Sequence, residues 1–541
     1  MEQQQIPPVT AVFLVVFDQK VGYTIAWKRS LPEIDLDGVE YKSLPSGLHA
    51  VKEDLVYFVH GSCAGVSVFV QGEADARHRN ANFVAVGALV LPLDHGVLGR
   101  GWVHAEELRS LSKHLVHNST DTRPLELFWT KYRSDADPRR KSAGPASSSP
   151  GGGKKRKRSG SDATLAGFNA DGAWPLDHPA LSVPNILETF GPLLFPIHRA
   201  ALSRRRILFL GSPSVQRNVN AVYITSVLSS IPRSLSENLP SEAEGILRSS
   251  PLFSIGIHDL PSLTTKTPDP KGWIATTTDD ILREKKGLYD FLIELPSQTD
   301  PKRPWPRLRT SDGKIVKASQ RDLRRWTLLR RELRRLRRQT VSRDADESST
   351  TESDRRPLLE RRGTSSFGED FYDMGLQNRD ESEAVEVSSW QAMAYRGFMW
   401  WASAGEASAW ENDEAKADEE LLFDMPDVAN LFPGTSGQRR QEDQESEYSR
   451  AAATTLVAYF QRVTEGLLRP LASIVEQADD DTEEGIQEDQ IEVTGDAVRD
   501  MGLDSWSEAD KNFVKDMMKT WFDREAIVAD QGVRLCGVRI C

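Results

Sequence analysis

Residues 11–27 read AVFLVVFDQKVGYTIAW, and this stretch predicts a β-sheet fold for the first part of the chain. Its first seven residues are all apolar and rich in valine and phenylalanine, a composition typical of a buried strand. Tyr23, Ile25 and Trp27 then recur at every second position, as expected for a strand with one buried face. Because residues 18–22 end in a glycine, we predict a hairpin loop between the two strands.

The remainder of this region predicts more strands, followed by a helix. Its apolar runs are separated by glycine-containing or polar segments, and leucines then recur at a helical spacing. We therefore predict a small α/β domain over residues 9–133 with a central antiparallel sheet. The further expected elements are strands at 55–60, 65–71 and 83–91 and a helix that carries Leu108, Leu111 and Leu115.

A second α/β unit is predicted over residues 178–297. Residues 206–210 read RILFL and are followed by Gly-Ser-Pro, which indicates a short buried strand that ends in a turn. A helical apolar pattern follows over residues 219–231, and strands and helices continue to alternate, which favours a mainly parallel sheet. The other expected elements are a helix over 184–206 broken at Pro192 or Pro196, strands at 253–257, 273–275 and 288–295, and a helix over 279–284.

The C-terminal part, residues 387–535, is predicted to be all helical. Apolar residues at helical spacing run from Leu456 to Ile474, with Pro470 as the expected position of a kink. Ser507 begins a pattern that resembles a capping box before another helix. The expected fold class is therefore α/β for the first two units and all-α for the last.

Two long segments, residues 134–177 and 340–386, are polar or low in complexity, so we predict disordered linkers there. The first linker carries the basic cluster KKRKR at residues 154–158. Such a cluster can serve as a nuclear import signal or contact nucleic acid. The alternative is a solvated basic tether, which is favoured because no aromatic residue is interleaved to stack on bases.

Length and composition exclude several classes of protein. The chain has 541 residues and a net charge of −12, and a length of this order suggests three or four folded units. Its apolar runs fall short of the ~18 residues of a membrane helix, and its start lacks a positively charged signal region. Three cysteines cannot form a disulfide framework or a four-cysteine zinc site. We therefore expect a soluble, reduced, intracellular protein.

The sequence offers one candidate nucleophile and little other catalytic chemistry. It contains no P-loop, no dinucleotide-binding glycine pattern and no His-x-x-x-His pair of the kind that binds zinc on a helix. Residues 61–65 read GSCAG, which is similar to the turn that presents the nucleophile of many hydrolases. That turn joins a strand to a helix, whereas the residues after Cys63 read as a strand, so we predict a hairpin without a catalytic role. No catalytic, cofactor-binding or metal-binding residue is predicted.

A strongly basic helix is predicted over residues 319–339. It lies within residues 301–343, which hold 16 basic and 3 acidic residues. Nine arginines cover most of the helix surface, and its leucines and tryptophan share the remaining face. That apolar face consists of Leu323, Trp326, Leu329, Leu333 and Leu336.

Three interpretations are open for this helix. It can lie on an anionic membrane with its apolar stripe inserted, it can bind RNA, or it can pack on the protein through its leucines. We predict reversible contact with an anionic surface, with a membrane as the first choice and an acidic protein as the second. If the apolar stripe is packed in the core, the contact should be weak and salt-sensitive. The residues expected to make it are Trp326, Arg330, Arg331, Arg334 and Arg335.

Four stretches carry a family resemblance. They are VVFDQKVGY (15–23), FGPLLFPIHRA (190–200), RILFLG (206–211) and WIATTTDDIL (273–282). In this order they resemble the DENN-type proteins, in particular the LCHN group. The resemblance implies a longin-like first lobe, a central DENN α/β lobe and a helical last lobe.

The same resemblance implies guanine-nucleotide exchange on a Rab-type small GTPase in vesicle or membrane traffic. An exchange factor binds the GTPase switch region in a conformation that holds Mg²⁺ and phosphates poorly, so it needs no nucleophile or cofactor. The interface would span the first two lobes, but the resemblance places no single residue on it. The alternatives are a DENN-fold scaffold without exchange activity and a nuclear protein associated with nucleic acid. We expect a cytoplasmic protein, peripheral on membranes, and do not expect nucleic acid as its partner.

Overall fold

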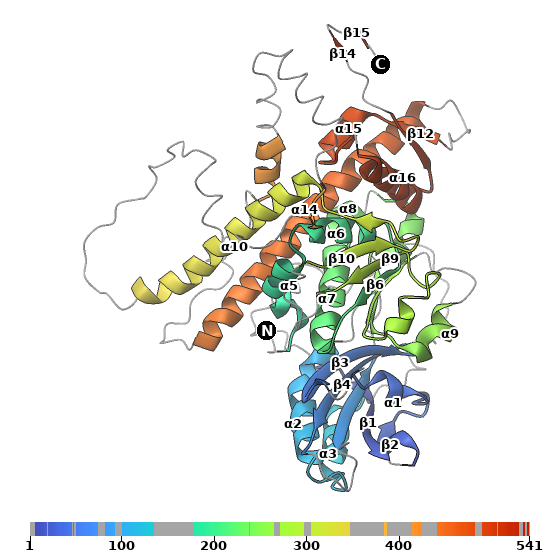
Figure 1. Ribbon diagram of the computed structural model, residues 1–541, viewed down its shortest axis with the longest axis vertical. Coiled ribbons are helices and arrows are strands. Elements are labelled where there is room, and N and C mark those ends of the chain that lie inside the picture. The colour runs from blue at the N-terminus through green and yellow to red at the C-terminus, as the bar shows by residue number, and fades with distance from the viewer. Residues whose placement is uncertain are drawn as a thin grey trace, which may run out of the picture.

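The computed structural model of the protein shows three lobes that follow one another along the long axis of the molecule (Figure 1). The first lobe comprises residues 6–134, the middle lobe residues 177–318, and the third lobe the described residues that follow. The structure describes residues 6–134, 177–346, 383–386, 414–422, 441–481, 490–529, 534–535 and 538–539, apart from residues 19, 46, 48–49, 74–81, 92–99, 237–238, 265–270, 297–304 and 506.

The first lobe is a five-stranded antiparallel sheet with helices packed on it, as the sequence predicts for its strands and its first long helix. The strand order is β3-β4-β5-β1-β2, and β1 and β5 are buried along most of their length. Continuous burial explains why these strands read as unbroken apolar runs. The elements are β1 (Val9–Asp18), β2 (Gly22–Ser30), α1 (Val39–Lys42), β3 (Glu53–His60), β4 (Cys63–Gln71), β5 (Phe83–Val90), η3 (Gly101–His104), α2 (Ala105–Leu115) and α3 (Arg123–Tyr132).

Glycines allow two phenylalanine rings to lie flat across this sheet. Gly87 faces Phe13 on the neighbouring strand, and Gly65 faces Phe58 in the same way. A Cβ atom on either glycine would collide with the ring opposite it. Both glycines are therefore required by close packing.

The middle lobe contains the parallel sheet that the sequence predicts. Strands β7, β8, β6 and β9 are adjacent in this order and pair in parallel, and β10 and β11 add an antiparallel edge that was not predicted. The prediction of a helix over residues 279–284 is wrong, because the chain forms only a short 3₁₀ turn there. The elements are η5 (Pro179–Ser182), α5 (Val183–Phe190), η6 (Gly191–Leu193), α6 (Leu194–Leu202), β6 (Ile207–Leu210), α7 (Val215–Leu228), α8 (Arg233–Ser236), η7 (Ser241–Ile246), β7 (Ser250–Ser254), η8 (Ile257–Asp259), α9 (Leu260–Leu263), β8 (Trp273–Thr277), η9 (Asp280–Leu282), β9 (Phe291–Glu294), β10 (Arg307–Thr310) and β11 (Ile315–Val316).

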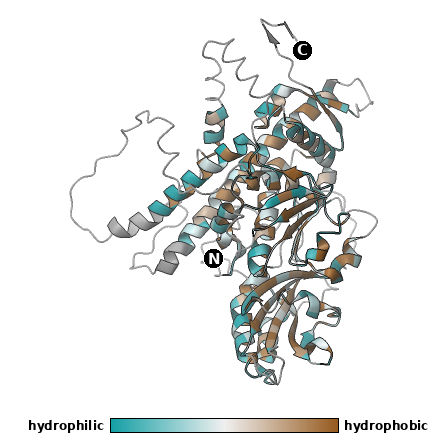
Figure 2. Ribbon diagram, viewed as in Figure 1, coloured by the Kyte–Doolittle hydropathy of each residue, from teal (hydrophilic) through white to brown (hydrophobic). Residues whose placement is uncertain are grey.

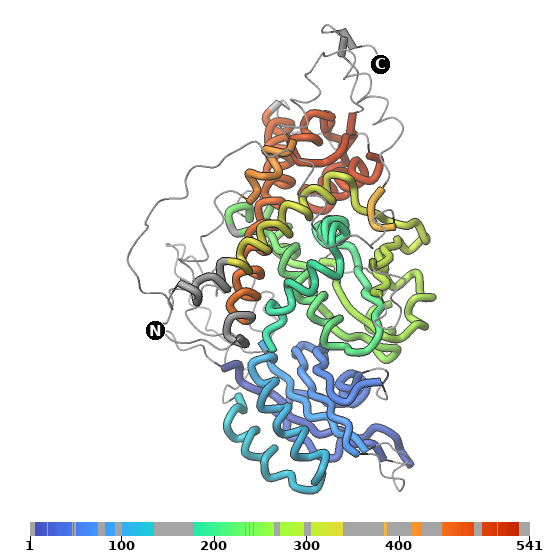
Figure 3. Tube along the Cα trace, turned by 60° about the vertical axis from the view of Figure 1, so that its left-hand side comes forward, coloured from blue at the N-terminus to red at the C-terminus, as the bar shows by residue number. Residues whose placement is uncertain are grey.

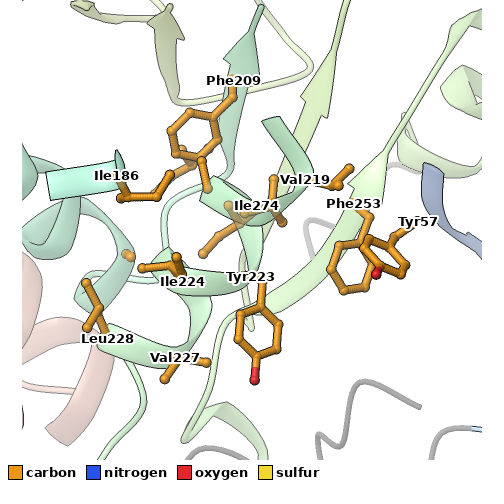
Figure 4. Packing of buried hydrophobic residues seen from close by; sticks show 14 of the residues in the cluster. Tyr57, Ile186, Phe209, Val219, Tyr223, Ile224, Val227, Leu228, Phe253 and Ile274 are labelled. Atoms are coloured by element: carbon orange, nitrogen blue, oxygen red, sulfur yellow. The ribbon is translucent and has the colours of Figure 1, made fainter. Parts of the chain in front are cut away.

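The two sheets join into one sheet of 11 strands, which the sequence did not reveal. β3 of the first lobe pairs antiparallel with β7 of the middle lobe through Phe58 and Phe253. Beside this pair, the ring centroids of Tyr57 and Phe253 lie 5.7 Å apart (Figure 4). The first two lobes therefore share backbone pairing and a common apolar core.

One helical stretch of the middle lobe, Pro179–Leu202, is long and apolar enough to cross a membrane by length and composition. It is broken into α5 and α6 at Gly191, close to the predicted proline break. Of its most apolar 18 residues, 67% are buried inside the protein. The stretch packs there against α7 and the third lobe. This burial is typical of a core helix, and Figure 2 shows the surrounding hydrophobic strands in brown.

The third lobe is mainly helical, but the prediction that it is all helical is wrong. Two short strands, β12 and β13, pair in parallel beside its last helices. α14 also continues beyond the predicted apolar run, to Asp481. Figure 3 shows α10 (yellow) and α14 (orange) side by side. The elements are α10 (Gln320–Asp346), α14 (Gln441–Asp481), β12 (Gln490–Val493), α15 (Gly495–Asp500), α16 (Glu508–Phe522), β13 (Glu525–Val528), β14 (Arg534–Leu535) and β15 (Val538–Arg539).

Several predicted segments lie outside the described residues. They include most of the two linkers, the basic cluster at residues 154–158 and the first part of the predicted helical region. Ser507 caps α16 as predicted, since its hydroxyl accepts the backbone N–H of Asp510. The reciprocal half of a capping box does not form, because the Asp510 carboxylate accepts the backbone N–H of Asp504 instead.

A buried histidine at the contact of the middle and third lobes predicts acid sensitivity. His198 of α6 is 2% exposed, and its Nε2 lies 3.2 Å from the hydroxyl of Thr464 on α14. Burial lowers the pKa of His198 to about 3. The unfolded chain takes up this proton near pH 6.5, whereas the folded chain does not, so stability falls as the pH drops below 6.5.

We expect this histidine to remove about 2 kcal/mol of stability between pH 6.5 and pH 5, at ~1.4 kcal/mol per pH unit. Urea unfolding of wild type and of His198→Gln at pH 7 and pH 5 measures the difference. The variant should lose less stability on acidification than wild type does. Substitution of the exposed His117 is the control, and an equal loss in wild type and His198→Gln would contradict the prediction.

Candidate functional site: the joint between the first two lobes

A buried carboxylate of the first lobe caps a helix of the middle lobe. Asp54 of β3 is 3% exposed and lies at the N-terminus of α7. Its Oδ1 accepts the Ser214 hydroxyl at 2.7 Å and the Gln216 N–H at 3.1 Å, and its Oδ2 accepts the Val215 N–H at 2.7 Å. These N–H groups have no partner inside the helix, and the helix dipole favours a negative charge at this end. Asp54 therefore fixes the orientation of one lobe on the other.

Ion pairs support this joint at two further points. The Arg109 guanidinium on α2 donates to both oxygens of Asp177 at 2.7 and 2.9 Å and to Glu53 at 2.5 Å. Hydrogen bonds from Arg109 to Asp177, and then to Glu53, raise the pKa of Arg109 above its usual value. Lys42 of α1 pairs with Asp259 of η8 at 2.6 Å. The joint is therefore held by charge-assisted contacts in addition to the shared sheet.

Exposed apolar side chains lie along this joint. Tyr41 of α1 stacks on His258 of η8, with ring centroids 4.2 Å apart. Ile257 of η8 and Ile281 of η9 follow the adjacent parallel strands β7 and β8, so they stand at the same sheet edge. Tyr41, Ile257 and Ile281 are 47%, 49% and 53% exposed. We call these three residues the seam patch.

The seam patch has the character of a protein-binding surface. Clustered apolar side chains on a folded surface commonly mark an interaction site. A pocket at the same carboxyl edge of the sheet, lined by Ser212, Arg217 and Asn218 among others, offers only about 20 Å³. That space is enough for a single water molecule.

The structure corrects one residue of the predicted anionic-surface contact. Trp326 is 3% exposed and packs edge-on against Trp305, with ring centroids 6.1 Å apart. Leu329 and Leu333 of the same stripe are also buried, where α10 packs on α14. Trp326 is therefore a core residue here and cannot insert into a membrane while the helix stays packed.

The four predicted arginines lie on α10 with different surroundings. The Arg330 guanidinium lies over the Trp326 ring, 5.2 Å from its centroid. Arg331 and Arg335 are largely exposed, whereas Arg334 is half-exposed. The structure does not bring any of them to the seam patch, since α10 belongs to the third lobe (Figure 1).

Cys63 occupies the hairpin between β3 and β4, opposite His60. It is 2% exposed, and its sulfur lies 3.8 Å from the Thr10 hydroxyl. Burial raises the pKa of the Cys63 thiol, which opposes formation of a reactive thiolate. The hairpin prediction is confirmed, and the absence of a catalytic role stays a prediction.

Sequence reasoning missed the residues of the joint. Tyr41 lies in the four-residue helix α1, which was not predicted, and Ile257 was placed in a strand that instead ends at Ser254. Nothing near Asp54 shows that it caps a helix 160 residues away. Ile281 lies in the stretch WIATTTDDIL, which carried part of the family resemblance. That stretch was the one part of the sequence that pointed to the seam patch.

Comparison with known proteins shows what the first two lobes are similar to. A family model described as "DENN domain-containing protein 11" matches residues 12–304, which span most of both lobes and their joint. A second model, a domain of unknown function (DUF4484), matches residues 385–490 and 481–541.

Individual relatives agree with this match. The DENN domain-containing protein 11 of Danio rerio is 27% identical over 56% of this chain and 58% of its own length. That of Rattus norvegicus is 27% identical over 56% of this chain and 62% of its own length. The uncharacterized protein ANR2 of Saccharomyces cerevisiae is 23% identical over 97% of this chain and 93% of its own length.

The match to the vertebrate relatives is partial, since the chain spans about 60% of the length of those it matches. The model match itself extends over more than half of this chain, from within β1 to beyond β9, and therefore covers the seam patch and all of the shared sheet except the start of β1 and the edge strands β10 and β11. The protein accordingly belongs to the DENN domain-containing protein 11 family, within the DENN-domain proteins.

Proposed function

We propose that this protein regulates a Rab-family small GTPase in vesicle or membrane traffic, by promoting guanine-nucleotide exchange. The family match supports a regulator of the DENN class in general. The observation that carries the proposal to a site is the seam patch, because it presents exposed apolar residues from both lobes on one surface. The GTPase would dock there.

The proposed exchange requires a rigid binding surface, and it requires no catalytic side chain. The GTPase must be held in a conformation that releases Mg²⁺ and nucleotide, and the free energy for this comes from differential binding. The cap at Asp54 and the pair between Lys42 and Asp259 keep α1, η8 and the sheet edge in place before the partner arrives. Preorganisation of this kind lowers the entropic cost of binding.

We further propose that the first lobe is longin-like and the middle lobe is the DENN α/β lobe. The five-stranded antiparallel sheet and the parallel sheet with its covering helices support this division. The protein would act in the cytoplasm, on membranes that carry its GTPase.

Charge insertion into the seam patch tests the proposal. The double variant Ile257→Glu/Ile281→Glu should slow nucleotide release at least ~10-fold, since interface hot spots contribute ~2 kcal/mol or more. The measurement is the release of fluorescent GDP from a panel of purified Rab proteins, with wild type first identifying the responsive one. Both isoleucines are exposed, so the thermal midpoint should not change.

The matched control is Leu127→Glu/Ile315→Glu. These two side chains are 71% and 56% exposed and lie on α3 and β11, away from the seam patch. The control should exchange as wild type does. Equal rates in both double variants would place the interface elsewhere, and a Rab protein that binds without faster release would favour the scaffold alternative.

A further inference from the structure

An acidic segment of the same chain covers the first half of α10. Residues 414–422, here called the acidic segment, contain a short helix between two undescribed regions. Asp418 is 2% exposed and lies 3.1 Å from Arg321 and 2.8 Å from Arg325. Glu414 pairs with Arg324 at 2.7 Å. Carboxylates of the acidic segment thus pair with arginines on successive turns of α10.

The second half of α10 carries a further set of arginines that this segment leaves largely uncovered. Arg331, Arg334, Arg335 and Arg338 follow one another at i, i+3, i+4 and i+7, so they line one face of the helix. The side chains of Arg331 and Arg335 are 70% and 66% exposed, and Arg338 is also exposed. We call these four residues the arginine stripe.

Among the described residues, two carboxylates contact the arginine stripe, and neither contact is both short and between segments. Glu419 of the acidic segment reaches Arg331 at 3.9 Å, close to the limit for an ion pair. Glu332 pairs with Arg335 within the helix at 3.2 Å. Exposed pairs of this kind contribute little and exchange readily with other partners.

The apolar side of α10 decides which kind of partner fits. Trp326, Leu329 and Leu333 are buried against the rest of the protein, so over residues 320–338, where the structure describes the side chains, α10 presents no exposed apolar face beside its arginines. Stable binding of a helix to a membrane surface uses apolar insertion together with charge. Charge alone, at helical spacing, matches an acidic helix better than a lipid surface.

We propose that the arginine stripe docks an acidic helical segment of a partner protein. The acidic segment of this chain already shows the mode of contact on the adjacent turns of α10. A partner helix with carboxylates at i, i+3, i+4 and i+7 would continue that contact along the stripe. This reverses the order expected from the sequence, where a membrane came first.

The test measures binding of a synthetic peptide to the full chain by fluorescence anisotropy. The probe is a fluorescein-labelled 16-residue helical peptide with glutamates at i, i+3, i+4 and i+7. Binding is expected at low salt, and weaker binding at high salt because the charges are screened. A peptide with glutamine in place of these glutamates should bind at least ~10-fold more weakly, since four exposed pairs are lost.

Charge reversal of the stripe gives the matching change in the protein. The variant Arg331→Glu/Arg334→Glu/Arg335→Glu/Arg338→Glu should also weaken binding of the acidic peptide at least ~10-fold. The control reverses four exposed basic residues outside α10 and has the same net charge. It is Lys28→Glu/Lys285→Glu/Lys286→Glu/Arg307→Glu.

A second variant tests whether the acidic segment lies beside the surface that binds the peptide. Glu414→Gln/Glu419→Gln removes two partly exposed carboxylates and should leave the fold intact. It should bind the acidic peptide ~3-fold more tightly, because the competing charges are gone.

Several results would overturn the proposal. Equal peptide binding by wild type and the stripe variant would do so, and so would an equal loss in the charge-matched control. Co-sedimentation with vesicles of phosphatidylserine and phosphatidylcholine, without any binding of the acidic peptide, would assign the stripe to a membrane instead. Unchanged affinity after Glu414→Gln/Glu419→Gln would refute the shared surface.

Discussion

Replacing Asp322 with alanine should lower the free energy of unfolding by about 3–5 kcal/mol, because it leaves a buried guanidinium without its counter-ion. Arg199 of α6 donates to both oxygens of Asp322 at 2.9 and 2.7 Å. Their side chains are only 15% and 2% exposed. Asp322 also accepts the backbone N–H of Ser319 at 2.9 Å, which caps α10. One carboxylate therefore joins the middle lobe to the basic helix.

The electrostatics of this pair explain the size of the effect. Burial alone would raise the pKa of Asp322, but the neighbouring Arg199 holds that pKa below its usual value, so the carboxylate stays ionised. Removing one member of a buried pair costs far more than removing both. The double variant Arg199→Met/Asp322→Leu should accordingly recover most of the stability that Asp322→Ala loses.

Urea unfolding monitored by circular dichroism measures these changes. Asp280→Ala is the control, since Asp280 pairs with Arg283 on the surface and its side chain is 81% exposed. We expect it to cost less than ~0.5 kcal/mol. A loss below ~1 kcal/mol for Asp322→Ala would contradict the role given to the pair, because buried pairs cost several times that amount when broken.

The second large effect is expected at the joint of the first two lobes. Asp54→Ala should cost about 2–4 kcal/mol, because it removes a helix cap and leaves buried donors without an acceptor. The donors are the N–H groups of Val215 and Gln216 and the hydroxyl of Ser214. Asp54→Asn should fall between wild type and alanine, since an amide oxygen can still accept but carries no charge.

A matched control for Asp54 lies in the turn between β1 and β2. The Asp18 carboxylate also accepts two backbone N–H groups, from Lys20 at 2.7 Å and Val21 at 3.0 Å, but it is exposed. Asp18→Ala should therefore cost ~1 kcal/mol or less. Equal destabilisation by the two alanine variants would show that burial and the lobe joint add nothing. If the seam patch binds a GTPase, Asp54→Ala should also slow exchange, because the two halves of the patch would no longer be held together.

Local periodicity predicted most of the individual elements. The alternation after Gly22 gave β2, the apolar run before it gave β1, and helical spacing gave α2, α7 and α16. These patterns are informative because an element that buries one face carries its apolar residues at a short, regular spacing along the chain. The short strands β12 and β13 escaped notice, since four residues beside an acidic run carry too little pattern.

The candidate sites could not be predicted to the same degree. The period of α10 is the same whether its leucines meet a membrane or another helix, so the sequence left both choices open and only packing on α14 decided between them. Similarly, a lone Asp54 at the start of a strand shows no sign of its role, because the helix that it caps is distant in sequence.

Patterns among neighbouring residues thus predicted most strands of the first two lobes, the longest helices and the parallel middle sheet, and they carried the family resemblance. The pairing of β3 with β7 into one sheet, the contact of Tyr41 with His258 and the burial of Trp326 are evident only in the folded protein. The physical reason is that strand pairing, helix capping and the burial of an amphipathic face are completed by partners far away in sequence, and no local pattern identifies those partners.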